Sequence, residues 1–362
     1  MASKYPYLAM IVMQTIYAGM VLVSKAALND GMNSSIFIFY RQISGAVILV
    51  PLAIIFERKN EVSLSFVTFC KIFALSFIGI TLSLNAYFFG LDYTSSTLGA
   101  AAMNCLPVLT FIFAVLLRME KVKIRTIPGI AKVFGFVVFI AGVATITFYD
   151  GPKLKPFFGH HPFEHPNTQL HQSQVPSRHK WIVGCLFFVI SIICWSLWLV
   201  LQVQVLKSYP SKLRYTSLMV CLSALQSFAV AIALERRASQ WKLGWNSRLL
   251  AIVYCGIMVT CVAYYLQAWL LEKKGPVFLA MSQPLNLIIA IIGSSFLLGE
   301  VIFLGSVIGG ILLVISLYSV LWGKSKEQSI RNQVPLPITL PEKEFAETKE
   351  ANVISPKNQM AK

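Results

Sequence analysis

The hydrophobic positions of this chain form ten long runs, separated by short polar stretches. A helix needs about 20 apolar residues to cross a bilayer core of about 30 Å, because it rises about 1.5 Å per residue. Each run is close to that length, and each is expected to be helical, since an open strand would leave unpaired backbone groups in hydrocarbon. The ten predicted spans are residues 7–27, 36–56, 69–90, 98–117, 128–148, 181–201, 213–234, 249–271, 277–298 and 304–322.

A unit of five spans occurs twice along the chain. Glu57-Arg58-Lys59 follows the second run, and Glu235-Arg236-Arg237 follows the seventh. In the same way Met103-Asn104-Cys105-Leu106-Pro107 in the fourth run is echoed by Met281-Ser282-Gln283-Pro284 in the ninth. Five is odd, so the second unit must enter the membrane from the opposite side. The sequence therefore predicts an all-α polytopic membrane protein of ten transmembrane helices, arranged as two inverted five-helix repeats.

The polar stretches divide the chain into four parts. The first repeat occupies residues 1–148 and the second occupies residues 181–322, with a central extramembrane loop at 149–180. Residues 323–362 are polar and too poor in apolar side chains to fold alone, so this tail is expected to be disordered. Two small-xxx-small patterns, Ala131-xxx-Gly135 and Gly305-xxx-Gly309, occupy equivalent places in the fifth and tenth runs. They predict a close-packed seam between those two helices.

Composition supports a membrane location. Hydrophobic residues make up 56% of the chain and charged residues only 13%, against about 25% charged in soluble domains. A net charge of +16 is unusual, but the basic residues occupy short loops between spans, so no nucleic-acid partner is expected. The bias of Lys and Arg among those loops predicts that the N- and C-termini are cytosolic.

No enzyme motif is present. The chain has no phosphate-binding Gly-x4-Gly-Lys loop, no Asp-Asp-x-x-Asp motif and no Gly-x-Ser-x-Gly elbow. The chain is therefore not expected to be an enzyme or to bind a cofactor. A metal site is also not expected, since the histidines all fall in the central loop without a Cys or Asp among them; they are His160, His161, His165, His171 and His179.

The polar residues at mid-depth are amides and phenols rather than carboxylates. Acidic residues stay at span ends, so the sequence identifies no proton relay. Lys25, Arg41 and Lys132 lie within a turn or two of a span end, from where each could snorkel to the interface. Buried amides need partners, so they face other helices or a wet cavity. Pro107 and Pro284 interrupt helical hydrogen bonding near the middle of equivalent spans. Such breaks expose backbone groups that can bind a polar solute, although a purely structural kink is the alternative.

These polar residues and the two prolines define the predicted substrate-binding set. Asn104 and Gln283 are expected to contact the solute across a cavity framed by the fourth and ninth helices. The full set is Gln14, Tyr17, Asn85, Asn104, Pro107, Gln267, Gln283, Pro284 and Asn286.

Several motifs together resemble one family. In the first half they are Gln14-x-x-Tyr17-Ala18-Gly19, Tyr40-Arg41-Gln42, Asn85-Ala86-Tyr87-Phe88-Phe89-Gly90-Leu91, Tyr93-Thr94-Ser95-Ser96-Thr97 and Asn104-x-x-Pro107. In the second half they are Lys274-Gly275-Pro276-Val277-Phe278, Pro284-Leu285, Gly299-Glu300 and Trp322-Gly323-Lys324. Over about residues 5–325 the chain resembles the plant nodulin-21-like family, also called walls-are-thin-related or UMAMIT proteins. This family lies within the drug/metabolite transporter superfamily, with its EamA repeat.

The resemblance implies a ten-helix fold of two EamA-like halves. It also implies export or facilitated movement of amino acids, or for some members of auxin or other small metabolites, in the plasma membrane or the vacuolar membrane. The expected partners are a small-molecule solute and the lipid bilayer. A channel and a receptor-like membrane protein remain the alternatives from the sequence.

Overall fold

The computed structural model describes nine segments of the chain. They are residues 5–29, 31–57, 64–94, 96–120, 125–149, 151–154, 178–244, 247–298 and 302–333. Most of the predicted central loop, with His160, His161, His165 and His171, lies outside the described residues, as do residues 334–362.

The ten predicted spans are confirmed within the described residues. Nine helices are long and apolar enough to cross a membrane, and the shorter apolar helix Ala102–Leu116 occupies the fourth run. The first half consists of α1 (Tyr5–Asn29), α2 (Ser34–Phe56), α3 (Phe66–Ser76), the π-helix η1 (Phe77–Leu82), α4 (Ser83–Tyr93), α5 (Ser96–Asn104), α6 (Leu106–Leu116) and α7 (Ile127–Phe148). The second consists of α8 (Arg178–Ser208), α9 (Lys212–Leu234), the 3-10 helix η2 (Ala238–Trp241), α10 (Ser247–Tyr254), the π-helix η3 (Cys255–Ala263), α11 (Tyr264–Lys274), α12 (Pro276–Met281), α13 (Gln283–Leu298) and α14 (Leu304–Gln333).

The second and seventh spans, α2 and α9, run antiparallel. At the end of α2, the Glu57 carboxylate accepts a hydrogen bond of 3.1 Å from the backbone N–H of Arg214, in the first turn of α9. At the other end of the pair, the α2 N-cap residue Asn33 donates to the carboxylate of Glu235, just after α9 (3.4 Å). Equivalent helices of the two repeats therefore point in opposite directions, which is the inverted arrangement that the sequence predicts.

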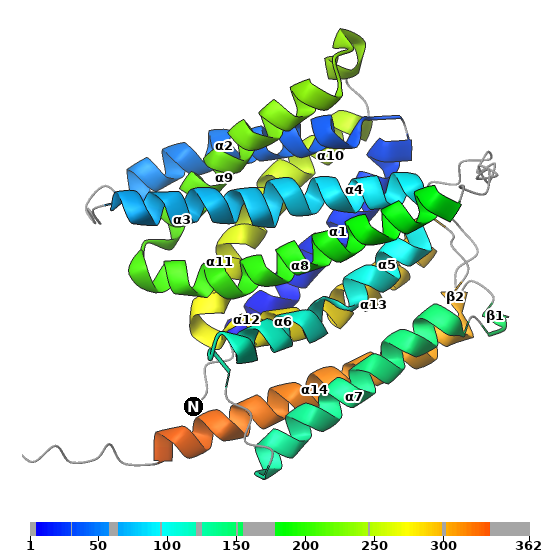
Figure 1. The fold of residues 1–362 in the computed structure, drawn as a ribbon. Coiled ribbons are helices and arrows are strands. Elements are labelled where there is room, and N and C mark those ends of the chain that lie inside the picture. Colours follow the sequence, from blue (N-terminus) through cyan, green and yellow to red (C-terminus); the bar gives the residue numbers. More distant parts are fainter. Residues whose placement is uncertain are drawn as a thin grey trace, which may run out of the picture.

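The fifth and tenth spans, α7 and α14, form the predicted close-packed seam and lie side by side in Figure 1. A Cβ placed on Gly142 would lie 3.2 Å from the Gly309 carbonyl oxygen, and one on Gly323 would lie 2.7 Å from the Pro128 carbonyl oxygen. Gly135 similarly faces the backbone of α14 at Ser316. As the residue numbers of these contacts fall along α7 from 142 to 128, they rise along α14 from 309 to 323. This equivalent pair is therefore also antiparallel.

The boundary between the second repeat and the tail differs from the prediction. Helix α14 continues to Gln333, beyond the predicted end of the span at residue 322, so the first residues of the predicted disordered tail are helical. Tertiary contacts explain the extension, because Gly323 packs on α7 and Lys324 pairs with Glu120 (3.2 Å). A two-residue antiparallel pair, β1 (Lys153–Leu154) with β2 (Ile302–Phe303), closes the opposite end of the seam.

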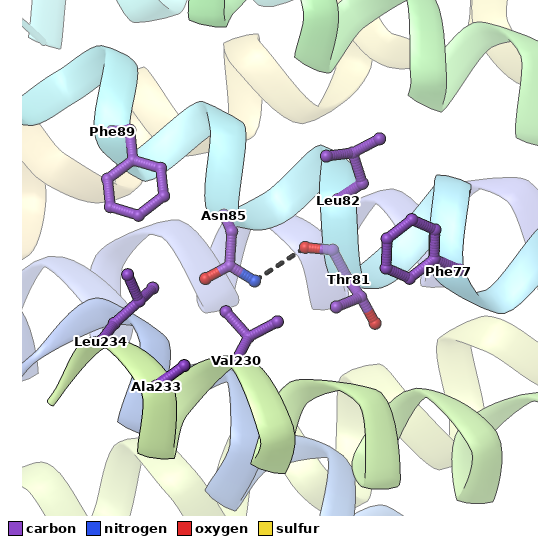
Figure 2. Close-up of a pocket in the computed structure, with 8 residues that line it drawn as sticks. All are labelled: Phe77, Thr81, Leu82, Asn85, Phe89, Val230, Ala233 and Leu234. Carbon is purple, nitrogen blue, oxygen red and sulfur yellow. Dashed lines mark hydrogen bonds between the residues drawn. The ribbon is translucent and has the colours of Figure 1, made fainter. Parts of the chain in front are cut away.

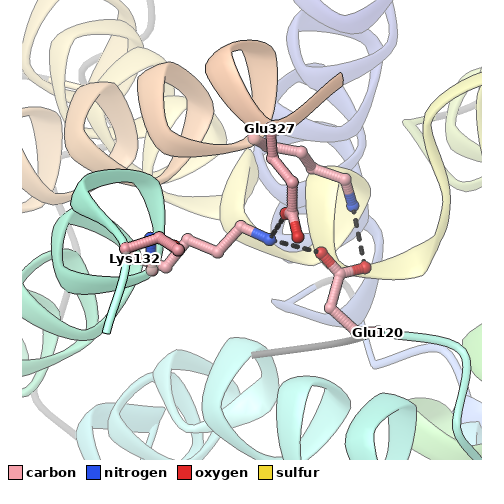
Figure 3. A network of polar contacts seen from close by, with 6 residues as sticks. Glu120, Lys132 and Glu327 are labelled. Carbon is pink, nitrogen blue, oxygen red and sulfur yellow. Dashed lines mark hydrogen bonds and ion pairs between the residues drawn. The ribbon is translucent and has the colours of Figure 1, made fainter. Parts of the chain in front are cut away.

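A buried ion-pair network lies at the Gln333 end of this seam, and Figure 3 shows it. The Lys132 ammonium is 3.1 Å from one Glu120 oxygen and also bonds Glu327, while Lys324 bonds the other Glu120 oxygen. Lys132 is only 2% exposed. The expectation that it snorkels is therefore wrong, because carboxylates from two other segments reach it inside the protein.

The network sets the ionisation of Glu120, which lies in the connection between α6 and α7. Burial raises the pKa of its carboxyl, but the ammonium groups of Lys324 and Lys132 more than offset that effect and hold the pKa below its ordinary value. A carboxyl whose pKa is lower in the folded state stabilises the fold above its unfolded pKa of about 4.3. That stabilisation is lost as the pH falls through the folded value.

Glu120→Gln should therefore destabilise the protein at pH 7 by about 3 kcal/mol, because it leaves a buried ammonium short of a partner. Thermal unfolding of the purified protein in detergent measures this, and the gap between variant and wild type should narrow as the pH falls below about 4. Glu272→Gln is the matched control: Glu272 pairs with Lys212 at the surface (2.8 Å, 36% exposed), where a pair contributes about 1 kcal/mol or less. Equal unfolding temperatures for the two variants at pH 7 would contradict the prediction.

Candidate solute-binding site

Both predicted helix breaks are present, at Cys105 and Ser282. Each break is a tight turn: the Cys105 N–H donates to the Ala102 carbonyl (2.9 Å), and the Ser282 N–H donates to the Leu279 carbonyl (3.1 Å). The two turns are 177 residues apart at both positions (282 − 105 and 279 − 102), so they are repeat equivalents. In each, proline is the second residue of the following helix. An N–H at this position would have no acceptor within the helix, so proline is tolerated there.

Helix α1 contacts the second break directly. The side-chain amide of Gln14, which is fully buried, donates to the Ser282 hydroxyl, and that hydroxyl donates to the Leu279 carbonyl at 2.6 Å. Gln14 thereby holds α1 against the start of α13. Polar groups therefore line the second break: the side chains of Gln14 and Ser282 meet the Leu279 carbonyl there.

The same face of α1 continues the polar contacts one turn later. The Tyr17 hydroxyl donates to the Gln267 side-chain oxygen (3.0 Å), and the Gln267 amide donates to the side-chain oxygen of Gln202 (3.2 Å). Residues three apart on a helix share a face, which is why Gln14 and Tyr17 point the same way. The contacts connect α1, α11 and α8 through the interior of the bundle.

Arg41 on α2 joins this region from another side. Its guanidinium Nη2 donates to the hydroxyl of Tyr264, which lies one turn before Gln267 on α11. Arg41 is only 4% exposed, so the expectation that it snorkels to the interface is wrong. Together these residues form what we call the central polar cluster: Gln14, Tyr17, Arg41, Gln202, Tyr264, Gln267 and Ser282.

Two π-helices shape the surroundings of the cluster. The π-helix η3 ends immediately before Tyr264, and η1 interrupts the equivalent third span. The wider π turn changes which side chains face inward, and such turns occur often at functional sites. In η1, Gly79 leaves room for Trp198, because an added Cβ would lie 2.1 Å from the indole Cγ. Trp198 in turn packs edge-on against the Tyr264 ring, with centroids 5.9 Å apart.

The structure brings part of the predicted set together. Gln14, Tyr17 and Gln267 belong to the central polar cluster, and Pro284 and Gln283 begin α13 at the adjacent break. Asn286, one turn along α13, has a buried side-chain oxygen without a hydrogen-bond partner among the described residues. Asn104 and Pro107 flank the first break, at the end of α5 and the start of α6.

Asn85 does not join the cluster. Its amide donates to the Thr81 carbonyl (2.7 Å, Figure 2), and its oxygen accepts from the Ser35 hydroxyl (2.9 Å). It lines a groove between the third span and α9, whose rim residues Phe77 and Leu234 are 42% and 51% exposed. Its exposed rim puts this groove on the outer surface of the bundle, and neither Gln14 nor Gln267 lines it.

Four members of the cluster were not in the predicted set: Arg41, Gln202, Tyr264 and Ser282. No sequence signal marks Arg41 for burial, because it lies only five residues after the start of the predicted span 36–56, close enough to that end to snorkel. Gln202 was missed because the sixth apolar run was expected to end at residue 201, whereas α8 continues to Ser208. Val203, Val205 and Leu206 keep this part of the helix apolar, so the span extends beyond its predicted end.

Known proteins match nearly the whole chain. The model of the EamA-like transporter family matches residues 4–147 and 182–322. The chain is 52% identical over 332 residues to the WAT1-related protein At5g64700 of Arabidopsis thaliana, covering 91% of this chain and 92% of that one. It is 36% identical over 325 residues to the Arabidopsis thaliana protein WALLS ARE THIN 1, covering 89% and 84%. A solved crystal structure superposes with a TM-score of 0.64 at 15% identity, covering 88% of this chain and 98% of that chain, which supports the fold alone.

Proposed function

The chain belongs to the EamA-like transporter family, among its plant WAT1-related proteins, and is a membrane transporter of small solutes; from this premise we propose that it carries amino acids by alternating access. It would act as an exporter or a facilitator. The observation that carries this proposal is the helix break at Ser282, whose hydroxyl accepts a hydrogen bond from Gln14 within the central polar cluster. Neutral amides and phenols beside a broken helix suit a polar zwitterion.

In the proposed alternating-access mechanism, the equivalent helices α2 and α9 of the inverted repeats move relative to each other. Glu57 contacts Arg214 at one end of the α2–α9 pair, and Asn33 contacts Glu235 at the other. Opening one of these contacts while the other stays closed would expose the midplane to one side at a time. Rocking of equivalent helices against each other is the simplest motion that this pseudo-symmetry supports.

A second solute class, auxin and other aromatic acids, is favoured by the aromatic side chains beside the cluster. Trp195 and Trp198 pack with ring centroids 5.2 Å apart, and Trp198 also contacts Tyr264. A planar ring stacks favourably on such side chains. The same transport mechanism would serve either class.

We place the protein in the plasma membrane or the vacuolar membrane with both termini cytosolic. The Lys274 ammonium lies 5.3 Å from the centroid of Tyr7, near the start of α1. Lys324, near the end of α14, lies close to Gly275. The start of α1 and the C-terminal part of α14 therefore lie on the same face of the bundle, and the charge bias of the loops favours the cytosol for that face.

The test is counterflow in proteoliposomes made with the purified full-length protein. Saturable exchange of labelled amino acids is expected, and Asn104→Ala and Gln283→Ala should each reduce it by about 2–10-fold, the effect of losing one hydrogen bond, without lowering membrane abundance. Wild-type rates in both variants would remove these two residues from the site. Flux that never saturates would favour a channel, and absence of any solute flux would favour a receptor-like protein.

A further inference from the structure

We propose that Arg41 binds the carboxylate of the transported solute. The substrates would then be organic acids with a free carboxylate, amino acids and aromatic acids alike, and not amines or esters. This inference rests on the proposed transport function and adds to it the group that the site recognises.

Arg41 carries a positive charge in the interior of the bundle. A guanidinium stays protonated in proteins, and an unpaired buried charge is strongly destabilising. No described carboxylate forms an ion pair with Arg41: the ion pairs among the described residues involve Glu57, Glu120, Glu272 and Glu327, each with another basic residue. The described residues that contact the guanidinium are Tyr264, through its hydroxyl and through its ring at 5.8 Å from the centroid, and Met20. A positive charge whose contacts among the described residues are all neutral indicates that its anionic partner arrives from outside the chain.

The guanidinium of Arg41 uses few of its N–H groups. Its Nη2 donates to the Tyr264 hydroxyl, and the one contact of its Nη1 among the described residues is the Met20 sulfur (3.5 Å), which is a weak acceptor. The buried Nε has no hydrogen-bond partner among the described residues. A planar fork with open N–H groups matches the two oxygens of a carboxylate.

Aromatic and polar side chains surround the guanidinium. Tyr264 contacts both Arg41 and the ring of Trp198, so a solute held at the guanidinium would meet an aromatic wall. The indole N–H of Trp198 is buried and also lacks a partner among the residues that the structure describes. Gln267 lies one turn along α11, within the same cluster. The guanidinium could thus recognise the carboxylate of the solute, the aromatic side chains its apolar part, and Gln267 a further polar group.

The rival role for Arg41 is bracing, in which it merely ties α2 to α11 through Tyr264. Tyr264→Phe separates the two roles, because it removes the hydroxyl that Arg41 contacts but leaves the charge. If Arg41 braces, Tyr264→Phe should impair transport as much as Arg41→Gln. If Arg41 binds carboxylate, Tyr264→Phe should keep the preference for acids over esters.

The experiment is proteoliposome counterflow with matched solutes. Alanine, phenylalanine and indole-3-acetate are each compared with their methyl esters, and the two amino acids also with ethylamine and phenethylamine. Wild type should carry at least one acid and neither its ester nor its amine, and Arg41→Gln should lose that flux by about tenfold or more, with partial recovery in Arg41→Lys.

Each outcome bears on a different claim. Equal flux of acid and ester through wild type, or an undiminished acid flux through Arg41→Gln, would overturn the carboxylate role and leave the transporter intact. Absence of flux for every solute would instead sink the proposed function. If Arg41→Gln does not fold, thermal shifts of wild type answer the same question, because acids should stabilise it and esters should not.

Discussion

Gln202→Leu is expected to lower counterflow of the preferred solute about tenfold or more, since each 1.4 kcal/mol changes a rate or affinity by that factor. Leucine keeps much of the volume of glutamine but leaves the Gln267 amide, which now donates to Gln202 at 3.2 Å, without its acceptor. An unsatisfied buried donor costs about 1–3 kcal/mol. Gln267 would reorient, and Tyr17 would lose the partner that fixes its hydroxyl.

Gln204→Leu is the matched control, two residues along the same helix. Gln204 is exposed on the surface of α8, so leucine at this position leaves the interior contacts of the helix unchanged. Its counterflow rate, normalised to the amount of folded protein, should stay near that of wild type. Similar losses of counterflow in the two variants would mean that this part of α8 is sensitive to any substitution. The hydrogen bond between Gln202 and Gln267 would then not explain the effect.

Gly309→Ala is expected to destabilise the protein by about 1–3 kcal/mol, the usual range for overpacking. The added methyl would lie 2.9 Å from the Gly142 carbonyl oxygen and 2.3 Å from a side-chain carbon of Ile146. The first of these contacts is backbone, which cannot rotate away, so α7 and α14 would have to separate. Thermal unfolding in detergent measures the loss.

The adjacent glycine provides the control for this second prediction. A Cβ on Gly310 would find its nearest neighbour, a carbon of Ile288, at 3.8 Å, an ordinary contact. Gly310→Ala should therefore be neutral or stabilising, because alanine favours a helix interior over glycine by about 1 kcal/mol. If both variants melted at the same temperature, the seam would not depend on close approach at Gly309.

The two variants also test how the repeats are held together. The α7–α14 seam joins equivalent helices of the two halves, and the Glu120 network closes its end. Loss of the seam is expected to lower stability without changing which solute is preferred, because no member of the central polar cluster lies on α7 or α14. Loss of the Gln202 side chain is expected to lower the transport rate more than the stability.

The amino-acid sequence by itself determined the ten spans, their duplication and the two helix breaks. These features depend on local properties: length and hydrophobicity set a span, an odd number of spans sets the inversion, and proline removes an N–H wherever it stands. The small-residue seam followed for the same reason, since Gly135 and Gly309 permit close approach by lacking side chains.

Only the tertiary structure decided which polar side chains meet. Gln14 and Tyr17 were identified by depth, but their partners Ser282 and Gln267 are 268 and 250 residues away, and no local pattern pairs them. Asn85 had the same depth and chemistry, yet its helix turns it toward Ser35 and an outer groove. Arg41 shows the converse: its distance from a span end favoured snorkelling, whereas the packing of α1, α2 and α11 buries its charge. The depth of a residue in the membrane follows from its position in its own helix, whereas its contacts depend on how several helices pack together.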